Sequence, residues 1–218
     1  MQNQVLIEKI STFRKNRIND VIAQKFLPNI ETSTSVFLHI VPANYFDNNI
    51  IDFSHAANNL TLELKPMATG GWDKMYNIDG FATFSTSASR EKISAYSQLF
   101  RNGAFEAYSS EFFWTSGDGI LKLDPELLAE EIIPTAMKAL AVLNQLQIQP
   151  PFYISFSLHN VLGKEIYNQR SYINQKFRND EIILPFLLLE NYQSDVKTIL
   201  KSNFDILYQS IGYASSPI

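Results

Sequence analysis

Three stretches of the chain carry apolar residues at the three- and four-residue steps of an amphipathic helix. The first covers residues 4–24. The second begins after Asp124, whose side chain can cap free N–H groups, has Pro125 in its first turn, and ends before the Pro150-Pro151 pair. The third covers residues 196–211. The pattern therefore predicts three helices.

Shorter runs between the helices predict strands. Residues 36–41 (VFLHIV) are apolar on both faces, which is typical of a strand inside a sheet. Residues 152–159 alternate apolar and polar side chains and predict a strand buried on one face. Residues 181–189 predict another strand, in which Pro185 indicates an edge or a bulge. Residues 60–65 alternate leucine with polar residues, which predicts a short strand or an extended arm.

Two further strand-like runs flank the Asn102-Gly103 pair. Residues 93–101 predict one strand and residues 104–113 the next. An Asn-Gly pair favours a two-residue type I′ turn, because both central positions of that turn need a positive φ. This turn places Leu99 opposite Glu106 and sets the register of the predicted hairpin.

The order of these elements indicates the fold class. Hairpins mixed with single helices favour an α+β fold over a parallel, doubly wound sheet. We expect a mixed, mainly antiparallel sheet with the Asn-Gly hairpin at its centre, packed by three helices. In this interpretation residues 1–25 form a connecting helix and residues 26–218 a single α+β domain. Residues 67–80, which contain Gly70-Gly71, are expected to form a loop.

Composition narrows the function classes. The chain has 218 residues, of which 45% are hydrophobic, so it can bury a substantial core. Its net charge of −4 argues against a mainly electrostatic grip on nucleic acid or anionic lipid. The absence of cysteine excludes disulfides, thiolate nucleophiles and cysteine-bound metals. No apolar run is long enough for a membrane span and the first residues lack the pattern of a signal peptide, so we expect no membrane partner and a cytoplasmic location.

Five segments together resemble a known family region. In their order and spacing they are similar to the region downstream of the Schlafen-type AlbA domain in bacterial proteins described as DNA-binding or ATP-binding regulators. A helix similar to residues 7–23 links the two parts in those proteins. The segments are FLHIVP (37–42), GWDKMYNIDG (71–80), QLFRNGAFEA (98–107), PPFYISFSLHNVLG (150–163) and NFDILYQSIGY (203–213).

The resemblance covers nearly the whole chain, but the AlbA domain itself is not part of it. The nucleic-acid and nucleotide functions belong to that domain and do not carry over to these residues. The resemblance implies a non-enzymatic interaction, sensing or assembly module of a bacterial intracellular regulatory or defence protein. Its expected partner is another protein or an upstream AlbA-type domain, and apolar faces on the first and last helices make self-association a further expectation.

The sequence contains no recognisable catalytic motif. It lacks the G-x-S-x-G turn of serine hydrolases and the glycine-lysine pattern of a phosphate-binding loop. His39, His55 and His159 do not lie at the spacings of a metal site, and a structural role is expected for each. We therefore expect no enzyme activity, no cofactor and no metal.

The carboxylates support one rival function and one structural pairing. Asp73, Asp79 and Glu106 together could hold a divalent metal, as in a hydrolase or nuclease. Arg101 and Glu106 share a face of the predicted hairpin, and a structural ion pair between them is the favoured interpretation.

The favoured binding patch combines aromatic side chains with one arginine near glycine-rich turns, a composition typical of binding hot spots. The alternative is that its tryptophans are core anchors and its aspartate caps a turn. The patch consists of Trp72, Asp73, Tyr76, Arg101, Asn102 and Trp114.

The first helix offers a second, smaller candidate surface. Arg14, Lys15 and Arg17, with Arg101 and aromatic residues for stacking, would serve a nucleic-acid-binding module. Because the stripe is short and the chain is acidic, a solvated face or a contact to an upstream domain is favoured over this use.

Overall fold

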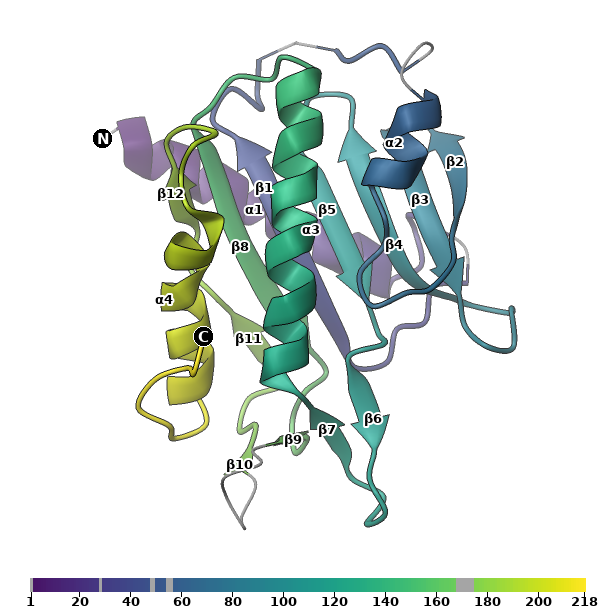
Figure 1. Ribbon diagram of the computed structural model, residues 1–218, viewed down its shortest axis with the longest axis vertical. Helices are drawn as coiled ribbons and strands as arrows, with labels where there is room; N and C mark the ends of the chain where they lie inside the picture. Colours follow the sequence, from purple (N-terminus) through teal and green to yellow (C-terminus); the bar gives the residue numbers. More distant parts are fainter. Residues whose placement is uncertain (1, 28, 48–49, 54–56, 168–174) are drawn as a thin grey trace.

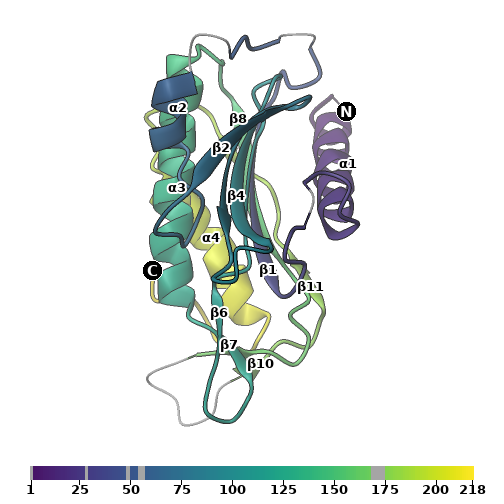
Figure 2. The same ribbon diagram turned by 90° about the vertical axis from the view of Figure 1, so that its right-hand side faces the viewer.

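A computed structural model describes residues 2–27, 29–47, 50–53, 57–167 and 175–218. It contains an eight-stranded antiparallel sheet with helices on both faces (Figures 1 and 2). Along the sheet the order is β11-β8-β1-β5-β4-β3-β2, and β12 also pairs with β8. The predicted α+β class with a mainly antiparallel sheet is confirmed. The strands are β1 Ser35–Pro42, β2 Asp73–Asn77, β3 Gly80–Thr86, β4 Ile93–Phe100, β5 Phe105–Ser109, β8 Phe152–His159, β11 Glu181–Ile183 and β12 Leu187–Leu189.

In the described residues, four helices pack on this sheet. α1 (Gln2–Ile22) covers one face alone, whereas α2 (Ala57–Glu63), α3 (Pro125–Gln145) and α4 (Val196–Gln209) lie on the other (Figure 2). The three predicted helices are confirmed as α1, α3 and α4. Asp124 caps α3 by accepting bonds from the first free N–H groups, as its sequence position predicts.

The strand predicted over residues 60–65 is wrong, since these residues belong mostly to helix α2. Leu60 and Leu64 are buried in the core while Leu62 is exposed. Residues four apart share one face of a helix, so the same leucines satisfy helical packing. The loop predicted over residues 67–80 is also incomplete, because residues 73–77 form the edge strand β2.

Two strand predictions are refined by the packing. β1 is the interior strand that its apolar sequence predicts, with β5 on one side and β8 on the other. β8 is buried on both faces, so the prediction of a half-buried strand is wrong. Its polar residues face α1, which the alternation alone did not reveal. Pro185 divides the run predicted over residues 181–189 into β11 and β12.

The turn of the β4–β5 hairpin also differs from the prediction. Leu99 lies opposite Phe105, and Gln98 opposite Glu106, so the expected register is shifted by one residue. The loop has three residues, because the amide of Gly103 donates to the carbonyl of Phe100 and the amide of Phe100 to the carbonyl of Ala104. Gly103 adopts a left-handed φ of +86° and Asn102 does not, which fits a type I turn followed by a glycine bulge rather than type I′.

A second, smaller sheet closes one end of the molecule (Figure 1). It has the order β10-β9-β7-β6. A turn at Gly117-Asp118-Gly119 joins β6 to β7 there. None of the described helices is both long and apolar enough to cross a bilayer. The small strands are β6 Phe113–Thr115, β7 Leu121–Leu123, β9 Glu165–Ile166 and β10 Gln175–Lys176.

Candidate binding site between helix α1 and the strand loops

A row of buried polar side chains crosses the sheet beneath α1. In register, Gln98 of β4 faces Glu106 of β5, Glu106 faces His39 of β1, and His39 faces Ser155 of β8. All four residues have no exposed surface. Directly opposite residues in an antiparallel sheet share a face, so the four side chains form one continuous line.

Glu106 is the centre of this row and is fully bonded. Its carboxylate accepts bonds from Arg17 Nη2 at 3.1 Å and from the Tyr96 hydroxyl at 2.7 Å. His39 Nε2 lies 3.0 Å from its other oxygen. The expected ion pair between Arg101 and Glu106 is therefore wrong. The hairpin register places Arg101 in the loop, and the cation comes from α1 instead.

The charges of the cluster follow from these contacts. Burial raises the pKa of Glu106, but the Arg17 charge and the His39 bond outweigh it and hold the pKa at about 2. Burial lowers the pKa of His39 despite the neighbouring carboxylate. The cluster thus consists of an ionised glutamate, a charged arginine and a neutral histidine that donates from Nε2.

The basic residues of α1 do not form an exposed stripe. Arg14 is 7% exposed and its Nη1 donates to Ser155 Oγ at 2.9 Å and to the carbonyl of Leu184 at 2.7 Å. Burial lowers the pKa of Arg14 to about 10. Arg17 is directed to Glu106, so only Lys15 of the predicted trio is exposed. The expectation of a solvated basic face is wrong for both arginines.

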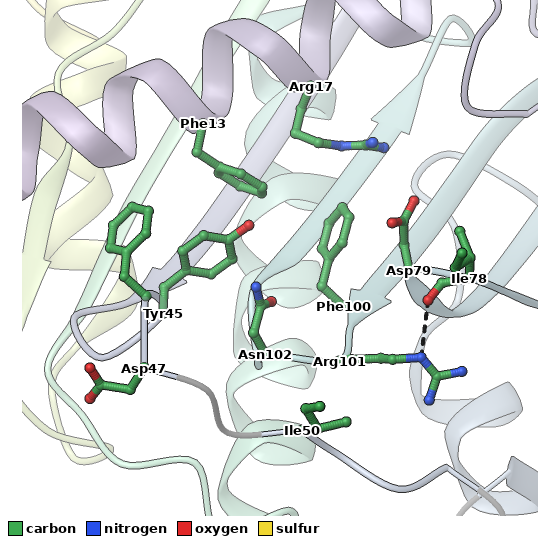
Figure 3. A pocket seen from close by; sticks show the side chains of 11 residues that line it. Phe13, Arg17, Tyr45, Asp47, Ile50, Ile78, Asp79, Phe100, Arg101 and Asn102 are labelled. Atoms are coloured by element: carbon green, nitrogen blue, oxygen red, sulfur yellow. Dashed lines mark hydrogen bonds between the residues drawn. The ribbon is translucent and has the colours of Figure 1, made fainter.

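A pocket of about 630 Å³ opens beside the Arg17–Glu106 pair (Figure 3). It lies between α1, the loop after β1, the β2–β3 turn and the β4–β5 loop. Backbone bonds tie these loops together, since the amide of Arg101 donates to the carbonyl of Asp79 at 2.8 Å and that of Ile51 to the carbonyl of Arg101 at 2.6 Å. The lining residues are Phe13, Arg17, Tyr45, Phe46, Asp47, Ile50, Ile78, Asp79, Phe100, Arg101 and Asn102.

Aromatic rings form one wall of the pocket. The ring of Phe13 lies 4.7 Å from that of Tyr45 and 5.7 Å from that of Phe100, and Figure 3 shows all three around the same space. Phe46 extends the series, 4.8 Å from Tyr45. Two of the rings already contact cations, because Arg17 lies 4.9 Å from the Phe100 centroid and Lys9 lies 5.4 Å from that of Phe46.

The remaining polar groups of the pocket lie on its loops. Arg101 Nε donates to the carbonyl of Ile78 at 3.0 Å (Figure 3). Within the described part of the chain, the carboxylates of Asp47 and Asp79 accept no hydrogen bond and form no direct ion pair, but the charge of Asp79 contributes to raising the pKa of Arg17. Burial raises the pKa of Tyr45, so its hydroxyl remains protonated at neutral pH.

The predicted patch is divided among three places. Arg101 and Asn102 lie in the pocket. Trp72, Asp73 and Tyr76 belong to the edge of β2, where the Trp72 indole donates to the carbonyl of Thr61 at 2.6 Å. Trp114 lies in the second sheet, with its ring 5.6 Å from that of Tyr167.

The carboxylates of the metal-dependent rival do not converge. Asp73 begins β2 and Asp79 lies in the turn after its other end, and the strand between them is roughly 13 Å long. Both oxygens of Glu106 are occupied by protein groups. Among the described residues no group of three or more carboxylates and histidines could hold a metal ion. His55 lies outside the described residues.

The pocket uses residues that the sequence did not select, among them Phe13 of α1, and Tyr45 from a loop that no pattern singled out. Arg17 was selected, but for a basic stripe with Arg14 and Lys15 and not for a pocket. Polar residues inside strands that are otherwise apolar, such as His39 and Glu106, were the available signal for the buried row. No such signal marks which loops meet α1.

Comparison with known proteins yields no relative: no family model, curated protein or solved structure matches the chain.

Proposed function

We propose that this chain is a non-enzymatic sensing and interaction module whose binding site is the pocket between α1 and the strand loops. The observation that carries the proposal is the make-up of that pocket. It joins an aromatic wall to the carboxylates of Asp47 and Asp79 in one hollow of about 630 Å³. A size of this order suits a small molecule or a single side chain of a protein partner.

The charges favour a cationic ligand. Arg17 is paired with Glu106, and the charge of Asp79 also acts on it. Arg17, Arg101, Asp47 and Asp79, counted together with Glu106, carry a net charge of −1. A ligand with an amine or guanidinium group complements this charge, and the aromatic ring of Tyr45 suits it as well. A phosphate backbone would meet the carboxylates of Asp47 and Asp79, which disfavours the nucleic-acid-binding alternative.

Helix α1 is the element through which binding would reach the rest of a larger protein. It supplies Phe13 and Arg17 to the pocket, and its Arg17 forms an ion pair with the buried Glu106. A bound cation would thus contact both the loops and the helix. In the proteins that this chain resembles, a similar helix joins this region to a Schlafen-type AlbA domain. The proposed role in a bacterial regulatory or defence protein of the cytoplasm rests on that resemblance.

The test compares ligands of one shape and different charge. We would titrate the chain with phenethylamine, 2-phenylethanol and phenylacetate, following the melting temperature and the heat of binding. The amine should stabilise the protein, because a ligand that binds only the folded state raises its stability, and the other two should not. A short lysine-containing peptide in the same series distinguishes a protein source of the cation from a free amine.

Asp79→Asn should weaken amine binding roughly tenfold or more, since it removes the charge that the ligand pairs with. The matched control is Asp73→Asn, which makes the same change at the start of β2, outside the pocket. Equal binding of all three ligands, or an unchanged affinity in Asp79→Asn, would contradict the proposal.

A further inference from the structure

Strand β2 is one edge of the large sheet. It pairs with β3 on one side, and no other described strand pairs with its second side (Figure 1). Large apolar side chains stand along it: Tyr76 is 53% exposed and Ile78, in the turn that follows, is 90% exposed. An edge of this kind presents backbone groups that can add another strand, and the amide of Lys74, which donates to Asp73 Oδ1 at 2.7 Å, would exchange that bond on pairing.

The register available to a second copy of β2 is restricted. In an antiparallel pair, two residues that lie opposite each other either both bond through their backbone groups or both do not. When β2 pairs with a second copy of itself about a two-fold axis, one residue must therefore lie opposite its own copy, and that residue is the centre of the pairing. The central choices are Lys74, Met75 and Tyr76.

Charge selects among these three registers. A centre at Lys74 places two lysines opposite each other, and a centre at Tyr76 places Asp73 opposite Asp79 of the second copy. Like charges directly opposite are destabilising. A centre at Met75 creates neither contact.

The Met75-centred register is complementary along its length. Lys74 faces Tyr76 of the second copy, twice by symmetry, so that each lysine meets an aromatic ring. Asp73 faces Asn77, whose side-chain NH2 donates to Gln98 Oε1 at 2.8 Å and has a second N–H for the carboxylate. Trp72 lies level with the exposed Ile78. A lysine on an edge strand ordinarily discourages pairing, but here it finds a partner.

We propose that β2 pairs with β2 of a second copy of this chain, antiparallel and centred on Met75, to form one sheet that runs through a two-fold dimer. The interface would be isologous, as in most homodimers. This inference does not rest on the pocket's ligand, although Ile78 belongs to both surfaces. It gives Trp72, Asp73 and Tyr76 a shared role on one edge.

The first test is the oligomeric state of the full chain, measured by sedimentation velocity over a range of concentrations. The wild type should form dimers as its concentration rises. Tyr76→Lys should be monomeric, because it places Lys74 opposite a second lysine at two symmetric positions. Lys74→Glu combined with Tyr76→Lys should restore the dimer through two ion pairs. Met137→Lys, a similar change on an exposed part of α3, should dimerise as the wild type does.

The second test fixes the register by cross-linking. The chain has no cysteine, so a single introduced cysteine reports its own neighbour. Met75→Cys should form a disulfide across the two-fold axis on mild oxidation. Asp73→Cys should not, because its two copies would lie four residues apart along the strands, roughly 13 Å. A wild type that stays monomeric, a Tyr76→Lys variant that still dimerises, a double variant that stays monomeric, or equal cross-linking of both cysteines would overturn the proposal.

Discussion

The two faces of the large sheet are built differently. Under α3 and α4 lies one continuous apolar core, which includes Leu143, Phe156 and Phe204. Under α1 there are two small apolar clusters, and the Gln98–Glu106–His39–Ser155 row separates them. Along α1, Ile10 packs in one apolar cluster, Arg14 and Arg17 contact the polar row, and Ile18 and Val21 pack in the other cluster.

The difference teaches how each face holds its helices. On the α3 face, stability grows with buried apolar area and does not depend on direction. On the α1 face, Arg14 and Arg17 must meet particular partners, because a buried charge without a partner is costly. The first arrangement makes the domain stable, and the second specifies where α1 lies.

The largest expected effect comes from the apolar face. Phe204 of α4 has no exposed surface, and its ring lies 4.8 Å from that of Phe156. Phe204→Ala should lower the free energy of unfolding by ~3–5 kcal/mol, because it removes apolar contacts and leaves a cavity. Urea denaturation would measure the loss. A cost below ~1 kcal/mol would mean that this face is not the main source of stability.

Breaking the charge pair on the α1 face should cost about as much or slightly less. Glu106→Leu leaves Arg17 largely buried without its carboxylate, and we expect a loss of ~3–4 kcal/mol. Arg17→Met combined with Glu106→Leu should cost less than Glu106→Leu alone, because no unpaired charge remains. A double-mutant cycle in urea measures this coupling, and strict additivity would argue against a buried ion pair.

Acid should weaken the α1 face selectively. His39 is neutral when folded with its pKa below 6.5, so its contribution is complete above about pH 6.5 and declines as the pH falls below it. Glu106 has an ordinary pKa of 4.5 and a folded pKa of about 2, so its contribution is lost between these values. The contribution of the ionised Glu106 to the free energy of unfolding amounts to about 3 kcal/mol.

Unfolding measured from pH 7 to pH 2 should show this loss for the wild type. The Glu106→Leu variant should lose less stability between pH 4.5 and pH 2, whereas Phe204→Ala should keep the wild-type pH dependence. The same acid slope in all three proteins would place the titrating groups elsewhere.

The smallest expected effect concerns the start of α3. The Asp124 side chain accepts bonds from the amides of Glu126 and Leu127. Asp124→Ala should cost about 1 kcal/mol, since it leaves these amides without a capping partner. Asp124→Asn is the control, because asparagine caps nearly as well. A thermal melt resolves the difference between the two variants.

Local patterns were enough to predict much of the fold. The helices of residues 4–24 and 196–211, the interior strand β1 and the Asp124 cap follow from spacing and from the chemistry of single side chains. The pattern failed where one spacing fits two structures. Leucines at positions 60, 62 and 64 suit a strand and a helix alike, and only the core that receives Leu60 and Leu64 decides.

The candidate sites depended more on tertiary structure. Arg101 and Asn102 of the predicted patch line the pocket, but the residues beside them, Phe13, Arg17 and Tyr45, come from distant segments. The partner of Glu106 changed from Arg101 to Arg17 because the turn added one residue to the loop. A single step in register moves a side chain to the other face of a sheet.

The sequence by itself therefore determined the fold class, most of the helices and strands, and the presence of polar residues inside strands that should be apolar. Only the tertiary structure decided that α1 covers those residues, that Arg14 and Arg17 point inward, and that three loops meet beside them. The physical reason is range: helix and strand patterns arise from neighbours along the chain, whereas a pocket or a buried ion pair forms between segments that the sheet brings together.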